Sequence, residues 1–337
     1  MTMYRLPSYH MFGKRTLAKR FAVLRAEINN ARTRNDADAI HDMRVASRRF
    51  HAAALIFSDC ISLSPLRECE RHVRRLRKSA GAARDCDVQR MFVDRLLTKS
   101  LGQRYRPGLE RLSLRLKQKR EKQTAELETA IKNFEKHGIV GAMQRALAAP
   151  LPRRRVPLKL RQRAAREIVL HLSSVLAFEQ FAYQPSATTQ LHQMRIAAKR
   201  LRYVMEIFNP VYRGRLKPYI KIVRSIQDTL GDMHDCDVWL QSLPRFLEKE
   251  RSRTAKFFGD TSPFSRIEKG ILYLAYVART EELKHYKAFA RIWKRTERDA
   301  TWKKFTDLIT RTRYHNETNA WIHRTRIDGL ADGDAPH

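Results

Sequence analysis

The chain has 337 residues, of which 43% are hydrophobic, so it is long enough and apolar enough to bury a substantial core. Lys and Arg number 68 against 35 Asp and Glu, which gives a formal net charge of +33 at pH 7. This charge attracts polyanions and disfavours cationic partners, so the compatible partner classes are nucleic acid, an anionic membrane surface and polyphosphate.

The N-terminal segment MTMYRLPSYHMFGKRTLAKR lacks the apolar run of a secretory signal, and no stretch approaches the roughly 18 apolar residues of a membrane span. We therefore expect a cytoplasmic protein without a membrane span. The basic residues are spread through the chain, so a membrane surface ranks third among the partners. Cys60, Cys69, Cys86 and Cys236 show neither a CxxC pair nor zinc-type spacing with histidine, which predicts reduced, buried thiols.

Along most of the chain, apolar residues recur three and four positions apart and glycines are few, which predicts an all-α fold. The chain also repeats once. The segment HDMRVASRRF, starting at His41, recurs as HQMRIAAKRL at His192, an offset of 151 residues. The segment GAARDCDV, starting at Gly81, recurs as GDMHDCDV at Gly231, an offset of 150 residues. Two blocks in the same order at nearly one offset indicate an internal duplication.

The segment AAPLPRRRVP between the copies contains three prolines, which break helices and favour extended chain. We place the domain boundary there. The final residues are polar and contain glycine, as is typical of a frayed terminus. The predicted organisation is a first repeat over 9–149, a linker over 150–157, a second repeat over 158–313 and a C-terminal tail over 314–337.

The first motif of each repeat predicts a helix with one cationic and one apolar face. At 100° per residue, the cations fall within roughly 80° of one another. In the first repeat they are His41, Arg44, Arg48 and His51, opposite Met43, Ala46, Phe50, Ala53, Ala54 and Phe57. In the second repeat they are His192, Arg195, Lys199 and Arg202, opposite Met194, Ala197, Leu201, Val204, Met205 and Phe208.

The helix before each glycine block carries a second stripe. In the first repeat the stripe comprises Arg67, Arg71, Arg74 and Lys78, backed by Cys69, Val73, Leu76 and Ala80. In the second repeat it comprises Lys217, Lys221 and Arg224, backed by Tyr219, Val223, Ile226 and Leu230. Asp228 takes the fourth place there, so we expect this stripe to contribute less.

Such stripes suit a repeating anion. Four basic residues over ten positions span about 15 Å of helix, long enough to meet several consecutive phosphates. Arginine offers a planar fork, lysine a mobile point charge, and histidine a donor whose protonation a nearby anion favours. The alternative is an ordinary solvated face. Because like charges at i,i+3 and i,i+4 cost a few tenths of a kcal/mol each, their repetition in both copies favours a ligand.

Gly81 and Gly231 are expected to terminate the basic helices. The aspartates that follow them are then expected to cap the next helix or to orient cations such as Arg84: Asp85, Asp87, Asp235 and Asp237. A carboxylate pair holding a divalent metal is the weaker alternative, because hard cations require more oxygen ligands than D-x-D supplies.

The dipeptides His41-Asp42 and His234-Asp235 suggest comparison with metal-dependent HD phosphohydrolases. Their repeat equivalents are His192-Gln193 and Arg84-Asp85, so neither pair is duplicated. We therefore predict no catalytic residue and no metal ligand. His41 and His192 each share a face with three other cations, which favours anion contact over a role in the core.

The paired motifs resemble the CHAD domain family, a duplicated, histidine-containing α-helical domain. The matching segments are HDMRVASRRF and HQMRIAAKRLRYVMEIF, each followed by a glycine block, and the similarity extends from about Tyr9 to Arg313. The resemblance implies two antiparallel four-helix bundles related by a pseudo-twofold axis. It also implies that basic residues of both halves line a central cleft or pore that binds inorganic polyphosphate, without catalysis and without a cofactor.

Residue by residue, the resemblance assigns polyphosphate contacts to His41, Arg44, Arg48, Arg49, His192, Arg195, Lys199, Arg200 and Arg202, with Arg67, Arg71, Arg74, Lys217, Lys221 and Arg224 on the neighbouring helices. The stripes and glycine blocks add His51, Lys78, Arg84 and His234. Asp228, and His234 in place of Arg84, speak against a fully symmetric site. Some family members carry an N-terminal triphosphate-hydrolysing domain, and none fits before Tyr9. We therefore expect a stand-alone binder, targeted to polyphosphate granules or acting as an adaptor.

Two other functions compete with polyphosphate binding. Nonspecific binding of DNA or RNA is expected at low salt from the charge alone, although no groove-reading helix or stacking motif is recognised. A metal-dependent phosphohydrolase is the second alternative. It would need a preorganised metal or nucleophile set, for which the sequence offers only scattered candidates.

Overall fold

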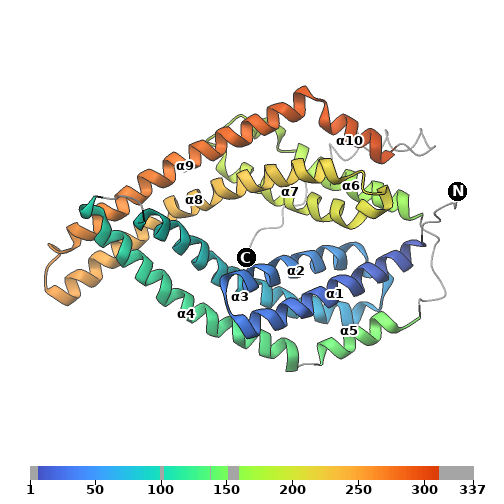
Figure 1. Cartoon of the computed structure of the whole chain (residues 1–337), viewed down its shortest axis with the longest axis horizontal. Helices are drawn as coiled ribbons and strands as arrows, with labels where there is room; N and C mark the ends of the chain where they lie inside the picture. Colours follow the sequence, from blue (N-terminus) through green and yellow to red (C-terminus); the bar gives the residue numbers. More distant parts are fainter. Residues whose placement is uncertain (1–6, 99–101, 137, 151–158, 311–337) are drawn as a thin grey trace. The chain divides into compact units, whose positions relative to one another are not determined.

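The computed structural model describes residues 7–98, 102–136, 138–150 and 159–310. Within these ranges the regular structure is entirely helical and no strand occurs, so the predicted all-α class is confirmed (Figure 1). The α-helices are α1 (Tyr9–Arg34), α2 (Ala37–Ile56), α3 (Leu63–Leu97), α4 (Arg106–Lys136), α5 (Ile139–Ala148), α6 (Leu160–Leu176), α7 (Thr188–Phe208), α8 (Lys217–Phe258), α9 (Phe264–Arg298) and α10 (Thr301–Thr310). Short 3-10 helices follow four of them: η1 (Ser58–Cys60), η2 (Gln103–Tyr105), η3 (Glu179–Phe181) and η4 (Asn209–Tyr212). None of the described helices is both long enough and apolar enough to cross a lipid bilayer.

Contacts among the helices divide the chain into two compact units. Of the described residues, the N-terminal unit comprises those within 7–150 and 238–280. The C-terminal unit comprises those within 159–237 and 281–310. Helices α8 and α9 therefore contribute one part to each unit. The predicted linker after Pro150 and the predicted tail lie outside the described residues.

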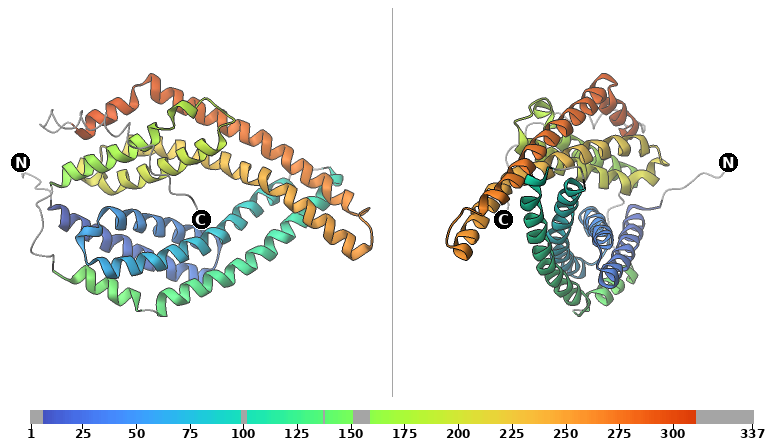
Figure 2. Two further views of the ribbon diagram at one scale, coloured as in Figure 1. Left: turned by 180° about the vertical axis from the view of Figure 1, so that it is seen from behind. Right: turned by 60° about the vertical axis from the view of Figure 1, so that its left-hand side comes forward.

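In the N-terminal unit, α2 packs against α1 and α3, and α3 packs against α4 and α5 (Figures 1 and 2). Caps fix the turn between α1 and α2. Asn35 adopts a left-handed φ of 48° and donates its backbone N–H to the Ala31 carbonyl, while the Asp36 side chain accepts the N–H of Ala39 at 2.7 Å. Asparagine tolerates this conformation and aspartate is a preferred N-cap, so these residues determine where α2 begins.

The apolar faces predicted for the motif helices are buried. Phe50 and Phe57 of the first repeat, with Leu76 on α3, are at most 1% exposed, and so are Leu201 and Phe208 of α7. Burying a large apolar side chain contributes about 1.5–3 kcal/mol. The rotation of each helix is therefore set by its apolar face, which directs the opposite, cationic face outward.

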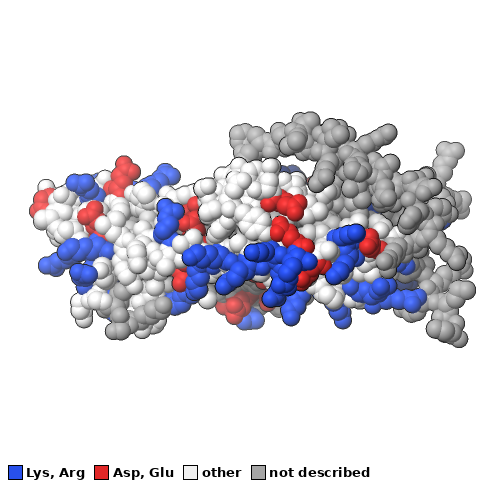
Figure 3. Space-filling view, turned by 90° about the horizontal axis from the view of Figure 1, so that it is seen from above, with Lys and Arg blue, Asp and Glu red and all other residues white. Residues whose placement is uncertain are grey.

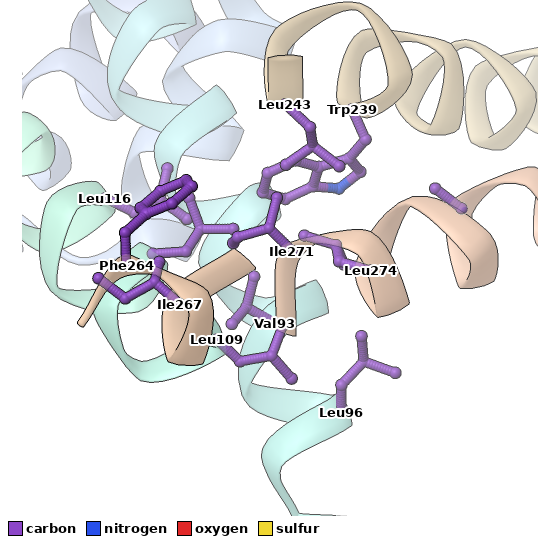
Figure 4. Packing of buried hydrophobic residues seen from close by; sticks show 12 residues of the cluster. Val93, Leu96, Leu109, Leu116, Trp239, Leu243, Phe264, Ile267, Ile271 and Leu274 are labelled. Atoms are coloured by element: carbon purple, nitrogen blue, oxygen red, sulfur yellow. The ribbon is translucent and has the colours of Figure 1, made fainter. Parts of the chain in front are cut away.

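A second core joins the ends of four helices in the N-terminal unit (Figure 4). Side chains from α3 and α4 pack there against the middle of α8 and the first half of α9. The buried members are Val93, Leu96, Leu109, Leu112, Leu116, Trp239, Leu243, Phe264, Ile267, Ile271, Leu274 and Ala278.

Two features tighten the packing of α4 in this unit. Gly108 and Gly270 face each other where α4 crosses α9, and a Cβ at Gly108 would lie 2.2 Å from the Ile267 carbonyl oxygen. Glu250 of α8 is buried and accepts a hydrogen bond from Nε of Arg115 on α4 at 2.8 Å, and it also contacts Arg253. Burial raises the pKa of Glu250, but these arginine hydrogen bonds outweigh burial and hold the pKa below its ordinary value.

In the C-terminal unit, α6 packs against α7 and α10. The Tyr212 hydroxyl donates to the Ile309 carbonyl at 3.4 Å, which ties η4 to α10. Trp293 of α9 lies 6.0 Å from Trp302 of α10, centroid to centroid. Tyr219, predicted to be apolar backing, is only half-buried, and its ring centroid lies 4.6 Å from that of Phe305 on α10.

The prediction that the glycine blocks end helices is wrong. Gly81 lies inside α3 and Gly231 inside α8, and neither has a positive φ. An interior glycine costs about 1 kcal/mol relative to alanine, and buried neighbours such as Ala83 and Cys86 continue the apolar face across it. Both helices therefore run on, and the four aspartates of these blocks occupy helix interiors without capping.

Candidate functional site

In the N-terminal unit, a cluster of cations forms where α2 lies against α3. We call His41, Arg44, Arg48 and Arg84 the N-terminal cluster. Burial lowers the pKa of His41, and the positive charges of Arg84, Arg44 and Arg48 lower it further, against an opposing effect of Asp42. The predicted basic face of α2 and Arg84 of the glycine block thus meet at one place.

The Arg44 side chain lies against Gly81 of α3, where the missing Cβ leaves space for its guanidinium group. A Cβ at Gly81 would lie 3.0 Å from Nη1 of Arg44, tighter than most such contacts. The same Nη1 lies 3.9 Å from Oδ1 of Asp85, one turn further along α3. Asp85 therefore orients Arg44, which is one of the two roles predicted for the aspartates. The Asp85 side chain is 69% exposed, so its own charge is largely solvated.

In the C-terminal unit, the equivalent cluster comprises His192, Arg195 and Lys199 of α7 with His234 of α8. We call these residues the C-terminal cluster. Nδ1 of His192 lies 3.0 Å from Nδ1 of His234, and the ring centroids are 4.1 Å apart. Nη2 of Arg195 lies 3.5 Å from the same His192 nitrogen. Because a guanidinium only donates, His192 Nδ1 is inferred to accept, and His234 Nδ1 then donates to it.

The surroundings of the histidine pair disfavour a positive charge on either ring. Burial, followed by the charges of Arg195, His192 and Lys199, lowers the pKa of His234 to about 4. Burial, Arg195 and Lys199 also lower the pKa of His192, against a smaller opposing effect of Asp237. Both imidazoles are therefore neutral at pH 7, poised to take up a proton when an anion offsets the neighbouring cations.

Carboxylates pair with the last basic residue, in chain order, on the basic faces of α2 and α7. Nδ1 of His51 contacts Glu70 of α3. In the C-terminal unit, Glu206 lies 3.6 Å from Arg202 and 3.9 Å from Arg224. The sequence analysis missed both acids, although the i,i+4 spacing of Arg202 and Glu206 is a recognisable ion-pair pattern.

The second stripes are exposed. In the N-terminal unit, Arg71 contacts Glu68, and Lys78 lines a groove of about 490 Å³ between α3 and α4. The members of these stripes that are exposed to solvent are Arg67, Arg71, Arg74 and Lys78 on α3 and Lys217, Lys221 and Arg224 on α8.

Two predicted contacts lie away from the histidines on their helices. Arg200 lies about 80° around α7 from His192 and, after burial, lowers the pKa of His171 on α6. Arg49 occupies the equivalent position on α2, where it is half-buried. No described interaction brings Arg200 to the C-terminal cluster, and His171 is a neighbour that the sequence analysis did not single out.

The remaining candidate groups are explained by contacts or burial within the fold. Asp87 of α3 accepts a hydrogen bond from Nε of Arg120 on α4 at 2.9 Å. The four cysteines are buried thiols, and burial raises the pKa of Cys236 to about 12. Among the described residues, no group of three or more His, Cys, Asp or Glu side chains is arranged to hold a metal ion.

Each unit of this helical protein carries histidine and cations where two helices meet. The sequence model of the CHAD domain matches residues 15–244, more than half of the chain, so the chain belongs to the CHAD domain family. A search of curated protein sequences finds no match.

Solved structures carry the same fold. The crystal structure of the CHAD domain from the plant Ricinus communis is 17% identical, with a TM-score of 0.60 over 87% of this chain and 94% of that chain. PptA from Streptomyces chartreusis is 13% identical, with a TM-score of 0.60 over 86% of this chain and 100% of that chain.

Proposed function

We propose that this protein binds inorganic polyphosphate, or a similarly dense linear polyanion, through the N-terminal and C-terminal clusters, and that it catalyses no reaction on it. The observation that carries the proposal is the duplicated placement of a histidine beside cations that lower its pKa. Membership of the CHAD family, a polyphosphate-associated domain, supports the same ligand.

The electrostatics of the clusters favour a ligand over a solvated face. Arg44 and Arg195 are held half-buried next to their histidines, and the net charge of the chain is +33. Concentrating like charges raises the free energy of the unliganded protein, and a chain of phosphates would reverse that penalty at each cation. A linear phosphate chain needs no base-specific contact, which matches the arginine and lysine side chains of the clusters, because these present only donors.

The proposal keeps several finer features as predictions. They are the two four-helix bundles related by a pseudo-twofold axis, the basic cleft or pore, and recruitment to polyphosphate granules in the cytoplasm. The second stripes would extend the path of the anion beyond the histidines. Asp228 and Glu206 reduce the local positive charge in the C-terminal unit, so we expect the two units to contribute unequally.

A matched pair of double variants tests the proposal. Arg44→Gln with Arg195→Gln removes one cation from each cluster. Arg25→Gln with Arg291→Gln removes one exposed cation from each unit, away from the clusters, and changes the net charge equally. Charge-assisted hydrogen bonds contribute about 1.5–3 kcal/mol each, so we expect the cluster variant to lose at least about tenfold in affinity for polyphosphate.

The control variant is expected to lose about twofold or less. Equal losses in both variants would show that bulk charge, and not the clusters, binds the ligand. Thermal unfolding of all variants in the absence of polyphosphate checks that the fold is intact. Release of orthophosphate from polyphosphate in the presence of Mg²⁺ would contradict the non-enzymatic part of the proposal and favour the phosphohydrolase.

A further inference from the structure

The turn between α8 and α9 exposes two aromatic rings to solvent. Phe257 is 82% exposed and Phe258 is 58% exposed, at the very end of α8. Their ring centroids lie 4.8 Å apart at an interplanar angle of 77°. Single exposed apolar residues are common, but two adjacent large ones on a fixed helix end indicate an interaction site.

The hairpin that carries these rings is anchored at its base. Phe264 and Ile267, the first buried residues of α9, belong to the core shared with α3 and α4 (Figure 4). On the other helix of the hairpin, α8, Glu250 forms an ion pair with Arg115 of α4. In Figures 1 and 2 the turn between α8 and α9 lies at the free end of the hairpin that these two helices form.

The residues that neighbour the exposed rings in the sequence are rich in cations. We call residues 251–269 the hairpin tip. It contains five basic and two acidic residues, a net charge of +3. Arg251, Lys256, Arg266 and Lys269 are all exposed. Figure 3 shows this end of the N-terminal unit at the left, where Lys and Arg border uncharged surface with some acidic side chains among them.

An apolar surface continues from the tip along α9. Leu272 is 56% exposed and Tyr276 is 70% exposed. With Lys269, these residues are spaced three and four apart, so they share one face of the helix. The hairpin therefore exposes both apolar side chains and cations, at its tip and along one face of α9.

We propose that the hairpin tip is a docking surface for an anionic lipid bilayer, with Phe257 and Phe258 inserted at the interface and the surrounding cations on the lipid headgroups. Apolar side chains beside Lys and Arg are the combination that interfacial membrane binding requires. Charge complementarity fixes the sign of the lipid, because a net charge of +3 at the tip favours anionic headgroups.

Other occupants fit the tip less well. A second copy of the chain would bring two identical cationic tips together, which like-charge repulsion opposes. Polyphosphate offers nothing apolar to cover the rings. Single-stranded nucleic acid stacks its bases on aromatic faces, but Phe257 and Phe258 meet nearly at right angles, so they do not offer parallel platforms to successive bases.

Co-sedimentation of the full chain with vesicles tests this inference, using phosphatidylcholine alone and phosphatidylcholine mixed with phosphatidylglycerol. The test variant is Phe257→Ser with Phe258→Ser. The matched control is Leu55→Ser with Met91→Ser, which removes two apolar residues of the same unit that are 67% and 60% exposed. We expect binding to the anionic vesicles only, reduced at least about tenfold in the test variant and unchanged in the control.

A third variant, Lys256→Gln with Lys269→Gln, is expected to weaken vesicle binding several-fold. Polyphosphate affinity serves as an independent readout, because the tip variants leave both clusters intact. The inference would be overturned if the variant that lacks both phenylalanines bound anionic vesicles as strongly as the wild type. It would also be overturned if the wild type did not bind anionic vesicles. Loss of single-stranded DNA binding with vesicle binding retained would instead identify the tip as a stacking site, and would overturn it as well.

Discussion

Binding of polyphosphate should take up protons at the histidine pair. The pKa of His234 is about 4 in the unliganded protein, chiefly because of burial and the Arg195 charge. A phosphate chain that neutralises Arg195 and Lys199 would return this pKa toward the ordinary value of about 6.5. The complex would then bind a proton that the unliganded protein lacks.

The size of the effect follows from the two pKa values. With a pKa of about 6.5 in the complex, moving from pH 7 to pH 5 protonates His234 there but hardly at all in the unliganded protein, so affinity should rise by up to roughly 20-fold from this group alone. With the same two pKa values, up to about 0.75 of a proton should be taken up per complex at pH 6. The pKa values of His41 and His192 are also lowered, so these residues add uptake in the same direction.

Isothermal titration calorimetry at pH 5, 6 and 7, in buffers of different ionisation enthalpy, measures both the affinity and the proton count. The control is His234→Gln, which removes the titrating group and keeps a polar side chain. Between pH 7 and pH 5, the affinity of this variant for polyphosphate should rise only by the amount that protonation of His41 and His192 contributes. An equal rise in the wild type and the variant, or no rise in the wild type, would refute the assignment of this histidine.

The same lowered pKa predicts that, without ligand, His234 makes the protein less stable as pH falls from about 6.5 to about 4, because the unfolded chain binds the proton first; thermal unfolding across that range measures this loss. Gly81→Ala should fold normally but weaken polyphosphate binding several-fold, because its Cβ would lie 3.0 Å from the Arg44 guanidinium; a titration with Gly231→Ala, where nothing lies within 4 Å, is the control. Gly270→Ala should lower the free energy of unfolding in urea by more than about 2 kcal/mol, since its Cβ would lie 2.2 Å from the Tyr105 carbonyl oxygen, whereas Gly231→Ala should be neutral or stabilising by up to about 1 kcal/mol. Glu250→Ala should cost about 3 kcal/mol by the same measurement, because Arg115 would lose its buried partner; a loss no larger than that of Glu248→Ala, an exposed acid on the same helix, would contradict this role.

Periodicity predicted the helical class and the rotation of α2 and α7 correctly, because the burial of residues such as Phe50 and Leu201 dominates the orientation of an amphipathic helix. The duplication showed that His41 corresponds to His192 in the first motif, and that Arg84 corresponds to His234 in the glycine block. Sequence spacing alone did not show that each pair meets across two helices, since that contact depends on how the helices pack.

The sequence analysis failed where a local rule was overridden by tertiary contacts. Glycine is a common helix terminator, but the apolar face around Gly81 continues through Ala83, and burial outweighs the small helical penalty. The carboxylate of Glu70 was missed because it reaches His51 from a neighbouring helix. Residues 238–280 pack with the N-terminal helices through Trp239 and Phe264, a long-range pairing that no repeat offset encodes.

The most direct test of polyphosphate binding is a competition titration at near-physiological salt. Labelled long-chain polyphosphate bound to the protein is displaced by unlabelled polyphosphate or by duplex DNA at equal phosphate concentration. Our account predicts a strong preference for polyphosphate, because the clusters offer cations at a helix face and no groove-reading element. Equal or better displacement by duplex DNA would contradict it and identify a nucleic-acid-binding protein on this fold.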